Sequence, residues 1–168
     1  QFHEAYTTDL VNTLGNCSSR VSAMVNKYCD GKLPPDIEGA IGGSDLQTTC
    51  KEATETAIAA MNRFELADGC AAAMSIVRRG DAFINETEPF KKAKDPDQRP
   101  VLGGILYRCA ESIRIASELL ASVMPGTMAQ LHAAWNIEAK GDLATRCRWG
   151  GLQAGQAIAK VALFPRVT

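Results

Sequence analysis

Apolar residues recur every three or four positions in the first part of the chain, and this spacing predicts a long helix from residue 2 to about residue 29. Its apolar stripe comprises Tyr6, Leu10, Leu14, Cys17, Val21, Met24 and Tyr28. Because a helix has 3.6 residues per turn, these side chains share one face, which we expect to be buried. The helix should end at Asp30-Gly31, and the prolines and glycines within 33–45 predict a surface connection.

The same spacing predicts further helices. The second begins after Ser44 or Asp45, either of which can cap it, and runs to about residue 62. The third covers about 65–87 and stops there because the residue before Pro89 disfavours helical geometry. The residues expected on its inner face are Leu66, Cys70, Ala73, Val77 and Ile84.

Two more helices are predicted over about 101–123 and about 127–135, separated by Met124-Pro125-Gly126. The last thirty residues are glycine-rich and irregular, and they finish with an apolar segment, 161–166, that we expect to lie across the bundle as an extended tail. No segment shows the alternation of a strand. These elements predict an all-α fold: an antiparallel bundle of about five helices in a single domain over residues 1–168.

Composition agrees with a folded domain of low net charge. The 168 residues are 46% hydrophobic with a formal net charge of -1, so any binding of nucleic acid must depend on a local surface. No apolar run reaches the roughly 20 residues that span a bilayer, and the N-terminus lacks the pattern of a signal peptide. We therefore expect a soluble, cytoplasmic protein. The absence of an initiator Met also leads us to expect a piece excised from a longer polypeptide.

Cysteine and histidine patterns give no sign of a metal site. The six cysteines contain no CxxC pair, which excludes a zinc knuckle and favours buried reduced thiols over the alternative of disulfides. The two histidines, His3 and His132, belong to no metal-binding motif. We expect the glycine pairs at 42–43, 103–104 and 150–151 to serve turns or helix caps, because none belongs to a phosphate-binding motif.

A polar ridge accompanies the buried stripe of the first helix. Asn12, Asn16 and Arg20 are spaced by four residues and so share one face. Asn offers a donor and an acceptor and Arg a planar fork of donors, which suits the edge of an unpaired base or a carboxylate. The alternative is an ordinary solvated helix face.

A second candidate follows the third helix. Phe90 comes directly after a proline and is followed by Lys91, Lys92 and Lys94. An exposed aromatic ring beside cations is a stacking platform for a single-stranded base, and Lys91 and Lys94 are candidate phosphate contacts. The alternative is that Phe90 plugs the end of the bundle while the lysines solvate a loop.

Other charged residues give weaker indications. Arg78-Arg79 and the pair of Arg146 and Arg148 could touch phosphates, but isolated surface cations are common. Glu111 and Arg114 are three residues apart on the predicted helix over 101–123. We expect a surface ion pair there, worth roughly a few tenths of a kcal/mol.

Five blocks of sequence occur in an order that is typical of one family. They are residues 9–20 with 27–31, 83–91, 106–114, 124–128, and the closing pair 149–155 with 163–166. Together they resemble the C-terminal anticodon-binding domain of methionyl-tRNA synthetases, and the closing Trp-Gly-x-Leu and Leu-Phe-Pro-Arg segments are the most diagnostic. The resemblance covers nearly the whole chain and implies the helical bundle of class I synthetases.

The resemblance also implies roles for particular residues. In the family an Asn and an Arg on the first bundle helix recognise the cytosine that begins the CAU anticodon, and they map onto Asn16 and Arg20. A Trp of the family that stacks on anticodon bases is replaced here by Phe90. The implied partners are methionine tRNA and the catalytic domain of the same enzyme, with no DNA and no membrane.

The family's ATP-binding signatures are absent from this chain, so the resemblance implies no catalytic residue and no cofactor here, and assigns ATP and Mg²⁺ to the parent ligase. Two other functions stay open. The first is a helical module that kept the fold but binds protein, which the low net charge and the missing Trp favour. The second is a metal or redox bundle, which the spacing of Glu, His and Cys opposes.

Overall fold

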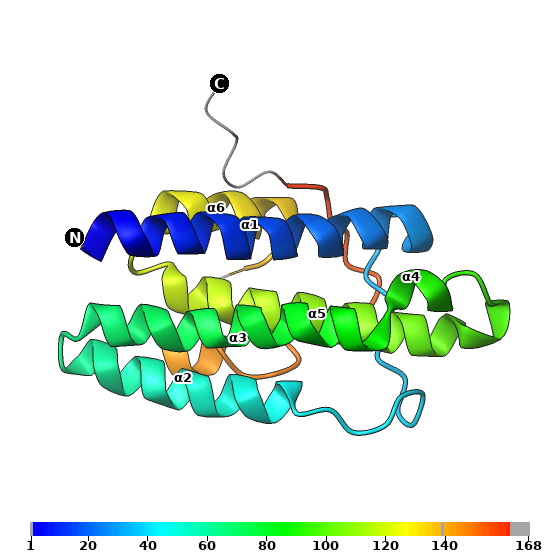
Figure 1. The fold of residues 1–168 in the computed structure, drawn as a ribbon, viewed down its shortest axis with the longest axis horizontal. Helices are drawn as coiled ribbons and strands as arrows, with labels where there is room; N and C mark the ends of the chain where they lie inside the picture. The colour runs from blue at the N-terminus through cyan, green and yellow to red at the C-terminus, as the bar shows by residue number, and fades with distance from the viewer. Residues whose placement is uncertain (1, 139, 162–168) are drawn as a thin grey trace.

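Helix α5 runs through the middle of the molecule, and the other helices pack around it (Figure 1). The computed structural model describes residues 2–138 and 140–161. Its elements in chain order are α1 (Phe2–Cys29), α2 (Leu46–Asn62), α3 (Leu66–Thr87), α4 (Pro89–Lys92), the 3-10 turn η1 (Pro96–Gln98), α5 (Arg99–Leu120), α6 (Pro125–Ala134) and α7 (Leu143–Arg146). Every residue from 109 to 120 is buried, so α5 is covered on all sides.

The five predicted helices are confirmed as α1, α2, α3, α5 and α6, with ends that differ by a few residues. The short helices α4 and α7 and the turn η1 were not predicted, because single turns carry too few residues to show a period. Helix α6 starts at Pro125, where a proline suits the first turn because it needs no donor. None of the described helices is both long and apolar enough to cross a membrane.

In the predicted apolar stripe of α1, Leu14, Cys17 and Val21 are buried as expected, and Met24 and Tyr28 are half-buried. The side chains of Tyr6 and Leu10 lie outside the described part of the chain. Two other expectations were wrong. Leu66, assigned to the inner face of α3, is 47% exposed, because it is the first residue of α3, directly after the turn that follows α2. Asp45 occupies the position before α2 without capping it, because its carboxylate accepts hydrogen bonds from Arg79 Nε at 2.9 and 3.0 Å.

The glycine pair at 103–104 lies inside α5, so the expected turn or cap is also wrong. A Cβ on Gly103 would lie 3.1 Å from the Pro35 carbonyl oxygen, and the missing side chains let the connection between α1 and α2 pack directly on α5. Arg108 of α5 fixes the same connection, donating from Nε to Asp36 Oδ2 at 3.1 Å and from Nη1 to the Gly42 carbonyl at 3.1 Å.

The end of the chain returns to α1. Backbone hydrogen bonds join Leu33 N–H to the Gln156 carbonyl at 2.9 Å and Ile158 N–H to the Gly31 carbonyl at 2.8 Å. The expected apolar tail begins at Val161, and its residues 162–166 lie outside the described residues. All six cysteines are free, as predicted, and all but Cys29 are buried.

Acid should weaken the attachment of α6 to α5 at His132. Its Nε2 lies 2.9 Å from Ser117 Oγ and 3.4 Å from Glu118 Oε1, and Arg146 Nε lies 3.1 Å from the other oxygen of Glu118. Burial lowers the pKa of His132 below its ordinary value of 6.5, more than the Glu118 carboxylate raises it. At acidic pH the unfolded chain therefore binds more protons at His132 than the folded chain does. The contribution of neutral His132 to the free energy of unfolding is present in full above pH 6.5, and it is lost as the pH falls through the folded-state pKa.

We accordingly expect the midpoint of thermal unfolding to fall between pH 7 and pH 5. In the His132→Gln variant the midpoint should fall less over the same range. Circular dichroism at a series of pH values measures both curves. Parallel curves would show that His132 does not control the acid response.

Candidate nucleic-acid interface

The polar ridge predicted on α1 is exposed, as expected, and one of its residues, Arg20, forms hydrogen bonds with α3. Arg20 donates from Nη1 to Asp81 Oδ1 at 2.8 Å and from Nη2 to Asn85 Oδ1 at 3.3 Å. Asp81 and Asn85 are four residues apart on α3, so both face α1. The Arg20 side chain is still 41% exposed, while Asn16 lies one helical turn before it on the exposed surface of α1. The guanidinium is therefore both oriented and accessible.

Phe90 lies just beyond the end of α3 on the short helix α4. Glu88 turns the chain with a left-handed backbone conformation, φ 50°, and Pro89 begins α4 and is buried. The Phe90 ring is 46% exposed, so the alternative in which it plugs the bundle end is wrong. The plug at this corner is Pro89, and the ring keeps a surface that can stack on a base.

Arg20 and Phe90 lie at the same end of the bundle. Arg20 bonds Asn85, which precedes Phe90 by five residues, and Figure 1 shows α4 beside the C-terminal half of α1. The candidate interface thus consists of Asn16 and Arg20 from α1 and the α4 corner with Phe90. Asp81 and Asn85 belong to it as partners of Arg20, and helical spacing in α3 alone gave no signal for them.

The lysines after Phe90 differ in their surroundings. Lys91 Nζ lies 2.9 Å from Glu88 Oε2 with both side chains largely exposed, and Lys94 is exposed. An exposed pair of this kind contributes little stability, so Lys91 could exchange its partner for a phosphate at small cost. Lys92 is half-buried against the bundle.

The arginines of α3 are committed to acidic partners. Arg78 pairs with Asp9 of α1, and Arg79 pairs with both Asp45 and Glu86. The hydrogen bonds that Arg79 donates to the carboxylates of Asp45 and Glu86 raise its pKa above the ordinary value. These ion pairs leave little local positive charge on this part of α3.

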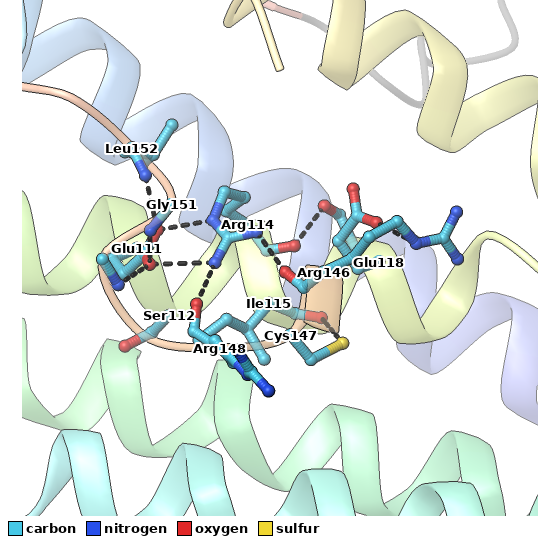
Figure 2. Close-up of polar contacts among 12 residues, drawn as sticks. Glu111, Ser112, Arg114, Ile115, Glu118, Arg146, Cys147, Arg148, Gly151 and Leu152 are labelled. Carbon is cyan, nitrogen blue, oxygen red and sulfur yellow. Dashed lines mark hydrogen bonds and ion pairs between the residues drawn. The ribbon is translucent and has the colours of Figure 1, made fainter. Parts of the chain in front are cut away.

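A second polar centre lies at the middle of α5, where the expected surface ion pair is wrong. Glu111 is completely buried and Arg114 almost so, and Figure 2 shows their side chains meeting under the chain that follows α7. Arg114 donates from Nε to Glu111 Oε1 at 2.6 Å and from Nη2 to Oε2 at 2.9 Å. The spacing predicted the pairing correctly, but it cannot show that another segment covers it.

That covering segment bonds to the pair through its backbone (Figure 2). Arg114 donates to the carbonyls of Arg146 at 2.6 Å and Arg148 at 2.7 Å. Glu111 accepts hydrogen bonds from the backbone N–H groups of three consecutive residues, Gly150, Gly151 and Leu152. A Cβ on Gly151 would collide with Arg114 Cζ and lie 2.6 Å from Arg114 Nη2, so only glycine fits this approach.

Tyr107 adds one more anchor, because its hydroxyl donates to the Leu152 carbonyl at 2.8 Å. Burial raises the pKa of Tyr107 to about 12, with the Glu111 carboxylate contributing. The blocks 106–114 and 149–155, singled out in the sequence, thus meet in space and hold the end of the chain on α5. Within the described residues, no three His, Cys, Asp or Glu side chains lie close enough to hold a metal ion.

The fold matches that of a helical region in an aminoacyl-tRNA synthetase. The chain superposes on the free-state structure of Mycobacterium tuberculosis methionyl-tRNA synthetase with a TM-score of 0.84 and 23% sequence identity, over 97% of this chain and 33% of that chain. The structure of the same enzyme bound by methionyl-adenylate gives a TM-score of 0.82 over 95% of this chain and 32% of that chain.

Sequence comparison extends the match. The chain is 35% identical over 180 residues to the methionine–tRNA ligase of Streptomyces coelicolor and 31% identical over 170 residues to that of Clostridium tetani. Each match covers 99% of this chain but only 33% and 26% of the respective relative. No protein-family model matches the chain. The chain is thus related along nearly its whole length to methionine–tRNA ligases, and it spans about a third or less of the length of these relatives.

Replacing Gly151 with Ala should destabilise the chain strongly. The new methyl group would displace the Arg114 guanidinium and break the buried pair, a class of change that costs about 3–5 kcal/mol. Urea unfolding measures the difference. Gly126→Ala is the matched control, because nothing lies within 4 Å of its added methyl group. Equal stability of the Gly151→Ala variant and the control would contradict the structural role of this approach.

Proposed function

We propose that this chain recognises the anticodon loop of methionine tRNA as a domain of a methionine–tRNA ligase. The observation that carries the proposal is the pairing of Arg20 with Asp81 and Asn85, which presents an oriented, exposed guanidinium at the end of the bundle where Phe90 is exposed. An oriented donor group loses less conformational freedom on binding than a free surface side chain.

The chemistry of this surface suits an unpaired cytosine. Arg20 can donate to the acceptor atoms on the pairing edge of the base, and the Asn16 side-chain carbonyl can accept from the exocyclic amine. Phe90 would stack on a splayed base of the loop, and Lys91 and Lys94 would contact phosphates. The near-neutral charge of the chain implies that this binding depends on base contacts more than on a broad positive field.

The ligase reaction would take place outside this chain. Under this proposal ATP and Mg²⁺ belong to the rest of the enzyme, the partners are methionine tRNA and that catalytic part, and the location is the cytoplasm. The competing function is a protein-binding bundle. The low net charge and the ion-paired arginines of α3 favour it, and the following experiment separates the two.

An RNA hairpin with a CAU loop should bind the chain more tightly than one in which the first base of the triplet is changed. We expect a difference of about 1–3 kcal/mol, which Asn16→Ala or Arg20→Ala removes. Fluorescence titration at two salt concentrations measures the affinity of the original chain and of each variant for both hairpins. Arg63→Ala is the control, because Arg63 is also an exposed arginine paired with a carboxylate, that of Glu65, but lies in the α2–α3 turn.

Equal binding to both hairpins would refute base reading and leave only general stacking. Absence of binding, together with unchanged charging of methionine tRNA by a full-length enzyme carrying Arg20→Ala, would favour the protein-binding function.

Phe90→Trp should strengthen binding of the CAU hairpin, and Phe90→Ala should weaken it by about 1–3 kcal/mol, because the area available for stacking increases in one variant and disappears in the other. The same titration measures both. Since Phe90 is already 46% exposed, neither change should alter the unfolding temperature much. If both variants bind like the original chain, Phe90 does not stack on the loop.

A further inference from the structure

The turn between α2 and α3 presents the most exposed large hydrophobic side chain among the described residues. Phe64 is 90% exposed, and Leu66, two residues later, is 47% exposed. Between them, Glu65 pairs with Arg63 at 2.9 Å. The tip is therefore apolar, and its charges are already paired with one another.

The backbone at Phe64 makes this residue unexpected. Phe64 N–H donates to the Met61 carbonyl at 3.0 Å and Glu65 N–H donates to the Ala60 carbonyl at 2.9 Å, which is the hydrogen-bond pattern of a Schellman helix end. The residue in the middle of this motif takes a left-handed conformation, and Phe64 has φ 61°. Glycine is favoured there because an L side chain crowds the backbone. Folding of the bundle alone would thus be served better by glycine than by an exposed phenylalanine.

The position of the tip separates it from the candidate nucleic-acid interface. Figure 1 shows the α2–α3 turn at the end of the bundle where α1 begins, whereas α4 with Phe90 lies toward the opposite end. The tip also carries no net positive charge that would favour RNA, because its one cation, Arg63, is accompanied by the carboxylate of Glu65. The chemistry of the tip instead fits an apolar protein surface.

We propose that the α2–α3 turn docks through Phe64 and Leu66 onto an apolar surface of the part of a methionine–tRNA ligase that this chain does not span. This inference rests on the proposed function. The relatives are three to four times longer than the matched region, so the rest of such an enzyme is large enough to supply that surface within the same polypeptide. Figure 1 shows α1 beginning at the same end of the bundle as the tip, so a part of the polypeptide joined before α1 would reach the tip without a change in the bundle.

The test uses Phe64→Gly, because this change removes the steric crowding of the left-handed backbone at residue 64 and also removes the docking side chain. In the 168-residue chain it should raise the unfolding temperature. In the full-length enzyme it should increase hydrogen exchange of the amides at 61–68. It should also lower kcat/KM for tRNA charging several-fold, with the rate of methionyl-adenylate formation unchanged.

Asp30→Gly is the matched control. Asp30 also follows a helix end with a left-handed backbone, φ 54°, but it is polar and follows α1, whose C-terminal half lies beside α4. The control should stabilise the chain without changing exchange at 61–68. Equal exchange at 61–68 in the original full-length enzyme and in the 168-residue chain would overturn the proposal. Self-association of the 168-residue chain that Phe64→Gly abolishes would also overturn it, in favour of contact between two copies.

The two proposals fail in different ways. If Arg20→Ala leaves charging unchanged while Phe64→Gly increases exchange at 61–68, docking stands and anticodon reading fails. If Arg20→Ala lowers charging and exchange at 61–68 is the same in both forms of the protein, anticodon reading stands and docking fails.

Discussion

The buried ion pair of Glu111 and Arg114 is the constraint on which the rest of the structure depends. Two charges at the centre of a helix that is covered on all sides carry a desolvation cost of several kcal/mol each. The chain meets this cost by surrounding the pair with backbone groups: three N–H donors on Glu111 and two carbonyl acceptors on Arg114. Because these groups all come from residues 146–152, the pair determines where the irregular end of the chain must run. It can do so only because Gly151 has no side chain.

Arg20 shows the opposite use of charge. Its pair with Asp81 is exposed, and pairs of that kind contribute about 0–1 kcal/mol to stability. Little stability is therefore lost if a base or another ligand replaces one of the contacts of Arg20. The same contacts hold the Arg20 guanidinium in a defined position against α3 when no ligand is bound. A buried pair that organises backbone and an exposed pair that orients a binding group are thus two separate devices, and only the second one suits recognition.

Helical period was enough to predict the five main helices, the buried stripe of α1 and the exposed ridge with Asn16 and Arg20, because each of these follows from the spacing within one segment. The failures involve contacts between segments. The i,i+3 spacing of Glu111 and Arg114 is the same on a surface and in a core, and only the return of residues 146–152 distinguishes the two. Asp45 has the residue type of a cap, but a nearby Arg79 from α3 competes for its carboxylate. Leu66 fits an apolar period but comes too soon after the turn to reach the core.

Residues 151 and 64 both occupy positions that favour glycine, but the sequence has glycine at only one of them. At residue 151 a side chain would collide with Arg114, and the sequence has glycine, so local chemistry and fold agree. At residue 64 the left-handed helix end favours glycine, and the sequence has an exposed phenylalanine, so they conflict. Sequences are generally consistent with their fold at every level, and conflicts concentrate where a site serves something other than folding. The conflict at Phe64 lies outside the core and outside the candidate nucleic-acid interface, which favours a role for this residue in binding rather than in folding.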